Sequence, residues 1–171
     1  MLVHLSIHNF GLIDKLTIEF TEHLNILTGE TGAGKSILID ALRCALGERM
    51  DTSSIRNPNE PCFIEAVFEI NDKKLRNNES ITEFLTNEDT NIIIQRTSMA
   101  DGKSKIKING MTVTVGQLRA LGNHLIDFHG AHDHQMLFAE DKHLGILEQL
   151  INSKKDYTDL KADYTNLNRI H

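Results

Sequence analysis

The chain has 171 residues, of which 40% are hydrophobic and 25% charged, enough to bury the core of one globular domain. A net charge of −6 and a pI of about 5.8 exclude a globally basic nucleic-acid-binding protein and leave only a local patch for that role. No apolar run has transmembrane length, the start lacks a signal-peptide pattern, and Cys44 and Cys62 form no disulfide or metal pattern. We therefore expect a cytoplasmic protein without a membrane partner.

The first 28 residues predict three strands. Residues 2–8 and 12–20 alternate between apolar and polar residues, and the short turn between them indicates an antiparallel hairpin. Residues 23–28 are a short apolar segment of strand length. We expect this third strand to be buried and to lead directly into the glycine-rich segment that follows.

Residues 29–36, with the sequence GETGAGKS, match the phosphate-binding pattern G-x-x-x-x-G-K-[ST] at every fixed position. Residues 36–47 follow as an apolar helix closed by a glycine, so the motif has the strand and helix that it requires. Backbone N–H groups of such a loop surround phosphate oxygens, and the helix start adds positive potential. Lys35 would reach the β- and γ-phosphates of ATP, and the Ser36 hydroxyl would bind Mg²⁺. The candidate ATP-binding residues are Gly29, Glu30, Thr31, Gly32, Ala33, Gly34, Lys35 and Ser36.

The middle of the chain alternates between turns and short regular elements. Residues 48–60 are polar and contain a proline, so they predict an irregular surface connection. Asn109 and Gly110 form a strong hairpin-turn signal. The other predicted elements are strands at 62–70, 91–98 and 104–108, a short helix around 81–85, a short helix at 115–121 closed by Gly122, and a buried strand at 124–128.

The tail differs from the rest of the sequence. Tyr157, Leu160, Tyr164 and Leu167 step by three, four and three residues, which is the spacing of a coiled coil. The alternative is an amphipathic helix that lies on the domain. We expect a projecting helix, and therefore divide the chain into a lobe at 1–140 and a helix at 141–171 that enters a coiled coil.

Two polar clusters are candidate sites. His129, His132 and His134 lie beside acids, but their spacing matches no closed four-ligand zinc pattern, which favours a nucleotide site or a polar hinge. No cysteine is placed for a Cys-His nucleophile. The second cluster is basic and lies on a predicted hairpin, where it is either a DNA contact or a solvated face. Its candidate DNA-contact residues are Arg96, Lys103, Lys105 and Lys107.

Several segments together resemble the RecN family of bacterial double-strand-break repair ATPases, which are related to SMC proteins. The resemblance covers essentially the whole chain in order and rests on residues 5–14, 27–42, 46–49, 95–96, 101–104, 108–110, 113–118 and 125–135. It implies the N-terminal lobe of an ABC-type, SMC-like ATPase head: an α/β P-loop NTPase fold with a mixed sheet and an antiparallel β-layer. It also implies ATP and Mg²⁺ as ligands, DNA as a partner, and a nucleoid-associated location in the bacterial cytoplasm.

The resemblance also marks what the chain lacks. Where the family has its Q-loop glutamine, which helps hold Mg²⁺ and the attacking water, this sequence has Ala131, and Gln135 is the candidate substitute. The family's signature motif, Walker B acids and switch histidine come from a C-terminal half of the head, and none occurs here. We therefore expect this chain to bind ATP with negligible turnover alone, and to work with that half and a second head.

Two alternatives stay open. The first is a small stand-alone P-loop NTPase or kinase, for which Asp127 would be the only Walker B acid. The second is a module that dimerises when nucleotide binds but does not hydrolyse it. The amount of ATP turnover by the chain alone separates these two from each other.

Overall fold

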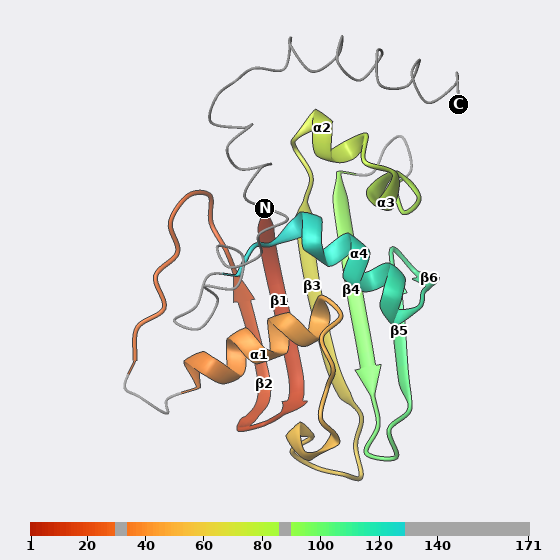
Figure 1. The fold of residues 1–171 in the computed structure, drawn as a ribbon. Coiled ribbons are helices and arrows are strands. Elements are labelled where there is room, and N and C mark those ends of the chain that lie inside the picture. Colours follow the sequence, from red (N-terminus) through yellow and green to blue (C-terminus); the bar gives the residue numbers. More distant parts are fainter. Residues whose placement is uncertain (30–33, 86–89, 129–171) are drawn as a thin grey trace, which may run out of the picture. The chain divides into compact units, whose positions relative to one another are not determined.

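The computed structural model describes residues 1–29, 34–85 and 90–128, which build a layer of strands with helices on one face (Figure 1). Six strands form one antiparallel sheet in the order β2-β1-β3-β4-β5-β6. The strands are β1 (Leu2–Phe10), β2 (Ile13–Glu19), β3 (Cys62–Glu69), β4 (Asn91–Ser98), β5 (Ser104–Ile108) and β6 (Met111–Thr112). The helices are α1 (Lys35–Ala45), α4 (Val115–Leu125) and the short η1 (Thr52–Ser54), α2 (Lys73–Arg76) and α3 (Glu79–Thr82).

Alternation of apolar and polar residues gives the sheet one buried face. Every second side chain of β3 is buried, and the register carries this face across the sheet. Ile64 pairs with Ile7 of β1, and Ala66 pairs with Ile94 of β4. Burial of a large aliphatic side chain of this kind contributes about 1.5–3 kcal/mol. The structure confirms the predicted hairpin at 2–20 and the predicted strands at 62–70, 91–98 and 104–108.

Helix α1 packs its apolar stripe against this buried face. Leu38, Ala41, Leu42 and Ala45 are buried, with the spacing that places them on one side of a helix. Gly47 follows with φ +103°, a left-handed conformation that closes the helix as predicted. The glycine loop is therefore followed by a helix that the sheet holds in place.

Helix α4 passes the end of α1 at short range. A Cβ atom on Gly122 would lie only 2.7 Å from the carbonyl oxygen of Leu46, the residue that caps α1. The prediction that Gly122 ends the helix is wrong, because α4 continues to Leu125, and the predicted strand at 124–128 is not formed. Gly122 is needed here for close helix packing, which requires the absence of a side chain.

This contact gives a first prediction. Gly122→Ala should lower the free energy of unfolding by about 1–3 kcal/mol, because the added methyl group meets the Leu46 carbonyl. Gly116→Ala is the matched control in the same helix: its nearest neighbour, Thr114 Oγ1, would be 3.8 Å from the new Cβ atom. Urea unfolding should show the control at wild-type stability or above it, by about 0.5–1 kcal/mol. Equal destabilisation by both changes would contradict the packing account.

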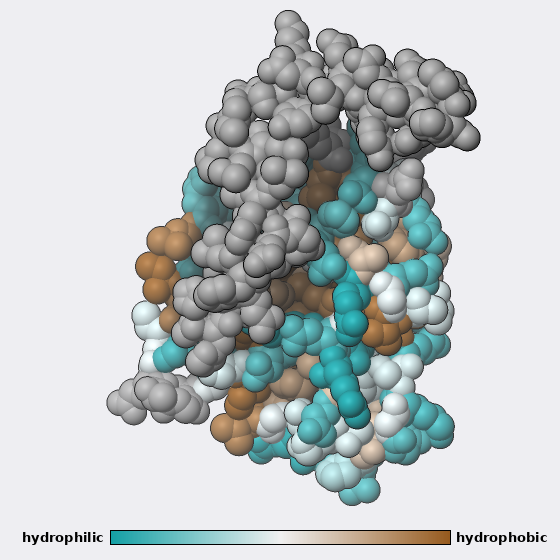
Figure 2. Space-filling view, in the orientation of Figure 1, coloured by the Kyte–Doolittle hydropathy of each residue, from teal (hydrophilic) through white to brown (hydrophobic). Residues whose placement is uncertain are grey.

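The predicted strand at 23–28 is also wrong. This segment is not a strand, and Leu24 and Ile26 are 79% and 73% exposed. In Figure 2, hydrophobic surface lies over the segment that connects β2 to α1. A strand forms only with a hydrogen-bonded neighbour, and in the described residues no strand pairs with this segment. The antiparallel layer of the predicted fold is confirmed, whereas the sheet that the described residues form contains no parallel pair and is not mixed.

Other elements are confirmed in part or lie outside the description. The short helix expected around 81–85 is found at Glu79–Thr82. The tail at 141–171, with its coiled-coil pattern, lies outside the described residues. Among the described helices, none has the length and apolar content needed to cross a membrane.

Candidate nucleotide-binding site

The start of α1 carries the geometry of an anion site. Gly34 caps the helix with φ +93°, in a left-handed conformation that favours glycine, and Leu38 N–H donates to its carbonyl oxygen at 3.0 Å. No side chain caps this end. The first N–H groups of a helix have no acceptor within the helix, so the start of α1 presents backbone donors of the kind that bind an anion.

Lys35 and Ser36 lie in the first turn of α1. Lys35 Nζ donates to the carbonyl oxygen of Gly29, the residue that opens the glycine loop. Ser36 is exposed in the first turn of α1, where its hydroxyl is accessible to a ligand. The residues between, Glu30, Thr31, Gly32 and Ala33, lie outside the described part of the chain.

The turn between β1 and β2 lies against the first turns of α1. Gly11, with φ +56°, approaches Ile37 so closely that a Cβ atom on it would be 3.1 Å from Ile37 Cγ2. Asn9 fixes this turn from the other side, because its side chain donates to the carbonyl oxygens of Asn57 and Glu60 at 3.0 and 2.9 Å. The position of the helix start is thus defined by the sheet and by the connection after α1.

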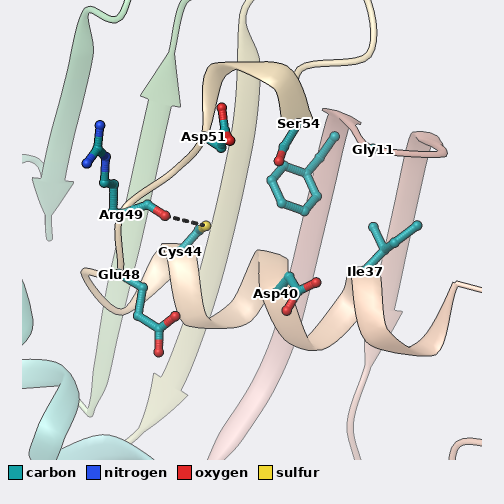
Figure 3. A pocket seen from close by; sticks show the side chains of 9 residues that line it. Gly11, Ile37, Asp40, Cys44, Glu48, Arg49, Asp51 and Ser54 are labelled. Atoms are coloured by element: carbon teal, nitrogen blue, oxygen red, sulfur yellow. Dashed lines mark hydrogen bonds between the residues drawn. The ribbon is translucent and has the colours of Figure 1, made fainter.

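A cavity of about 250 Å³ lies along α1 (Figure 3). Ile37, Asp40 and Cys44 face it from the helix, and the connection at 48–54 faces it from the opposite side. Neither Lys35 nor Ser36 lines this cavity. The start of α1 and this cavity are therefore separate features.

The two cysteines are structural. Burial raises the pKa of the Cys44 thiol, and it raises the pKa of the Cys62 thiol to about 11. Both thiols are therefore protonated at neutral pH, in which form cysteine is neither a nucleophile nor a metal ligand. Both cysteines are buried in the core.

The basic cluster is divided between the two faces of the sheet. Arg96 is only 5% exposed and faces α1, so its prediction as a DNA contact is wrong. It has the same parity along β4 as Ile92 and Ile94, which face the core, so alternation alone could have placed it there. Lys105 and Lys107 lie on the other face of the sheet.

The remaining candidates differ in their surroundings. Lys103 precedes β5 in the turn, where it is exposed and forms an ion pair with Asp101 at 2.7 Å. Lys105 and Lys107 pair in register with Thr97 and Gln95, which are uncharged, although Gln95 donates to the Glu65 carboxylate on the same face. The three histidines of the second cluster, together with Ala131 and Gln135, lie outside the described residues, and the described residues contain no group of three metal-ligating side chains.

Comparison with known proteins gives the family. Residues 4–170 match the family model described as AAA domain. The DNA repair protein RecN of Halalkalibacterium halodurans is 37% identical over 99% of this chain and 31% of that protein. RecN of Vibrio cholerae is 40% identical over 87% of this chain and 27% of that protein. The chain thus spans less than a third of the length of these relatives.

Solved structures give the fold independently. The Smc head domain of Pyrococcus furiosus, with an extended coiled coil and bound to the C-terminal domain of ScpA, has a TM-score of 0.63 at 20% identity. The similarity covers 99% of this chain and 48% of that chain. The antiparallel sheet, the glycine-capped helix and the sequence match agree, and the chain belongs to the AAA domain family, with the fold of an SMC-like ATPase head and a sequence similar to RecN.

Proposed function

We propose that this chain is the ATP-binding part of an SMC-like ATPase head that acts in DNA double-strand-break repair and recombination. The observation that carries the proposal is the start of α1, where Gly34 is left-handed, no side chain caps the helix, and Lys35 Nζ donates to the Gly29 carbonyl oxygen. These features together favour a polyphosphate ligand. The similarity to RecN supports the biological setting, in the bacterial cytoplasm near the nucleoid.

The residues present fit a nucleotide with Mg²⁺. Lys35 would contact the β- and γ-phosphates, the N–H groups of the first turn would donate to phosphate oxygens, and the hydroxyl of Ser36 would be a magnesium ligand. Bound Mg²⁺ would neutralise charge on the phosphates. Gln135 stays the candidate for the role of the missing Q-loop glutamine.

Exposed apolar residues support a second half of the head as the partner. Leu24, Ile26 and Leu27 are 79%, 73% and 46% exposed immediately before the glycine loop. A contiguous exposed apolar segment of this kind marks an interaction surface. We infer that the C-terminal half of the same head covers it and supplies the Walker B acids, and that two such heads close over two nucleotides.

DNA is the second proposed partner. Lys105 and Lys107 lie on the face of the sheet opposite α1 and α4. Their register partners on β4, Thr97 and Gln95, are uncharged. Two cations on an open face can contact phosphates without base recognition. Lys103 lies in the adjacent turn and is the third candidate, although its charge is offset by Asp101.

The experiment is ATP turnover with and without the second half. The chain alone should show negligible turnover, because its sequence lacks the Walker B acids, which the C-terminal half is expected to supply. Adding the C-terminal half of a RecN head as a separate chain should raise the rate at least about tenfold, a change of about 1.4 kcal/mol in the barrier. Robust turnover by the chain alone would instead support a stand-alone P-loop NTPase.

A further inference from the structure

The carboxyl end of α1 is held by a buried arginine from the sheet. One nitrogen of Arg96, Nη1, donates to the carbonyl oxygens of Cys44 and Glu48 at 2.6 Å each, and Nε donates to Ser104 Oγ at 3.4 Å. The last carbonyl groups of a helix have no N–H donor within the helix, and a positive charge at this end is stabilising. Arg96 therefore adds a charged donor to the end of the helix, where the Gly47 N–H also donates to the Cys44 carbonyl oxygen at 3.2 Å, and ties this end to the connection at Glu48.

Burying the charged side chain of Arg96 on this face of the sheet costs free energy. The guanidinium is buried in line with Ile92 and Ile94, and burial lowers the pKa of Arg96. Among the described residues, no carboxylate forms an ion pair with it; its acceptors are two backbone carbonyls and one hydroxyl. A buried cation without a carboxylate partner contributes little net stability, which favours a role in fixing geometry.

A second arginine reinforces the same end. Arg119 of α4 donates from Nη2 to the carbonyl oxygen of Gly47 at 3.1 Å, while Gly122 lies against Leu46. At the other end, Ser36 is exposed, and the first buried residue of α1 is Leu38. In the first turn, Ile37 lies against Gly11 of the β1–β2 turn, and the direction of the helix axis affects where Lys35 and Ser36 lie around this contact.

We propose that Arg96 is a positioning residue of the nucleotide site: by holding the carboxyl end of α1, it fixes where Lys35 and Ser36 lie. An α-helix of this length spans about 16 Å, so a tilt of about 4° moves its start by about 1 Å. A displacement of that size is enough to weaken a well-oriented site substantially. The proposal rests on the proposed function of the loop as an ATP site.

The experiment compares three variants of the 171-residue chain. Arg96→Met removes the donors and keeps an unbranched side chain. Arg96→Lys keeps the charge but cannot reproduce the planar guanidinium. Asn109→Ser is the control: it removes hydrogen bonds from Nδ2 to the carbonyl oxygens of Phe84 and Asn91, far along the chain from α1.

Two readouts are measured for each variant. The first is the set of backbone amide resonances of residues 34–37 in a ¹H–¹⁵N spectrum without nucleotide. The second is the dissociation constant for Mg-ATP. Arg96→Met should shift these resonances and weaken ATP binding at least about tenfold, Arg96→Lys should have an intermediate effect, and Asn109→Ser should change neither, despite lower stability.

The outcomes separate the two proposals. Wild-type amide resonances and wild-type ATP affinity in a folded Arg96→Met variant would overturn the positioning role. If Arg96→Met does not fold, Arg96→Lys decides: shifted resonances at 34–37 support the role, and unchanged resonances overturn it. If the wild-type chain binds no ATP, the proposed function fails, whereas the resonances still decide the role of Arg96 because they are recorded without nucleotide.

Discussion

Lys35→Ala is expected to weaken ATP binding by the 171-residue chain at least about 100-fold, a loss of about 2.7 kcal/mol. The ammonium group of Lys35 contacts the carbonyl oxygen of Gly29, the first residue of the loop that is proposed to bind the phosphates. Each hydrogen bond to a charged group contributes about 1.5–3 kcal/mol, and alanine removes all those that this side chain makes. Calorimetric titration with Mg-ATP measures the loss directly.

The matched control is Lys15→Ala. Lys15 is an exposed residue of β2, so its replacement changes the net charge by the same amount without touching the loop. This variant should bind ATP with wild-type affinity, which separates the local contact from the general charge. Unchanged binding in Lys35→Ala, with the fold confirmed by circular dichroism, would show that the glycine loop is not the ATP site.

The second large effect concerns the apolar segment before the loop. Ile26→Asp should abolish the gain in turnover when the C-terminal half of the head is added, because a carboxylate would be buried in the contact that Ile26 is proposed to make. Ile26 is 73% exposed in the structure of this chain, so the substitution should leave the fold and stability unchanged. ATP turnover of the mixed halves, measured over a range of concentrations, gives the result.

Met99→Asp is the control for this experiment. Met99 is also an exposed apolar residue, at 41%, but it lies at the turn between β4 and β5. The Met99→Asp variant, mixed with the C-terminal half of the head, should therefore show wild-type ATP turnover. A full gain in turnover with Ile26→Asp would mean that the segment at 23–28 is not the surface that receives the second half.

The antiparallel layer was predictable because its signal is local. Alternation in β3, from Cys62 onwards, and the Asn109-Gly110 turn each specify a strand or a hairpin within a few residues. The glycine loop and the closing Gly47 are equally local. These parts of the sequence need no knowledge of what lies elsewhere in the fold.

The errors arise where the outcome depends on distant residues. Leu24 and Ile26 have the composition of a buried strand, but a strand also needs a neighbour, and the described residues provide none. Gly122 has the sequence signature of a helix end, yet its role is decided by Leu46, far away in the chain. Arg96 has the charge of the neighbouring surface lysines, but its position in the alternation of β4 turns it toward α1.

The most direct test of the central claim is a ¹H–¹⁵N titration of the wild-type chain with Mg-ATP. Saturable shifts should be largest at the amides of Gly34, Lys35 and Ser36, because no side chain caps the start of α1. The amide resonances of β5, which lies near the opposite edge of the sheet from β1 and β2, should not shift. Saturable shifts confined to other regions, or no saturable shift at all, would contradict the assignment of an ATP site to this loop.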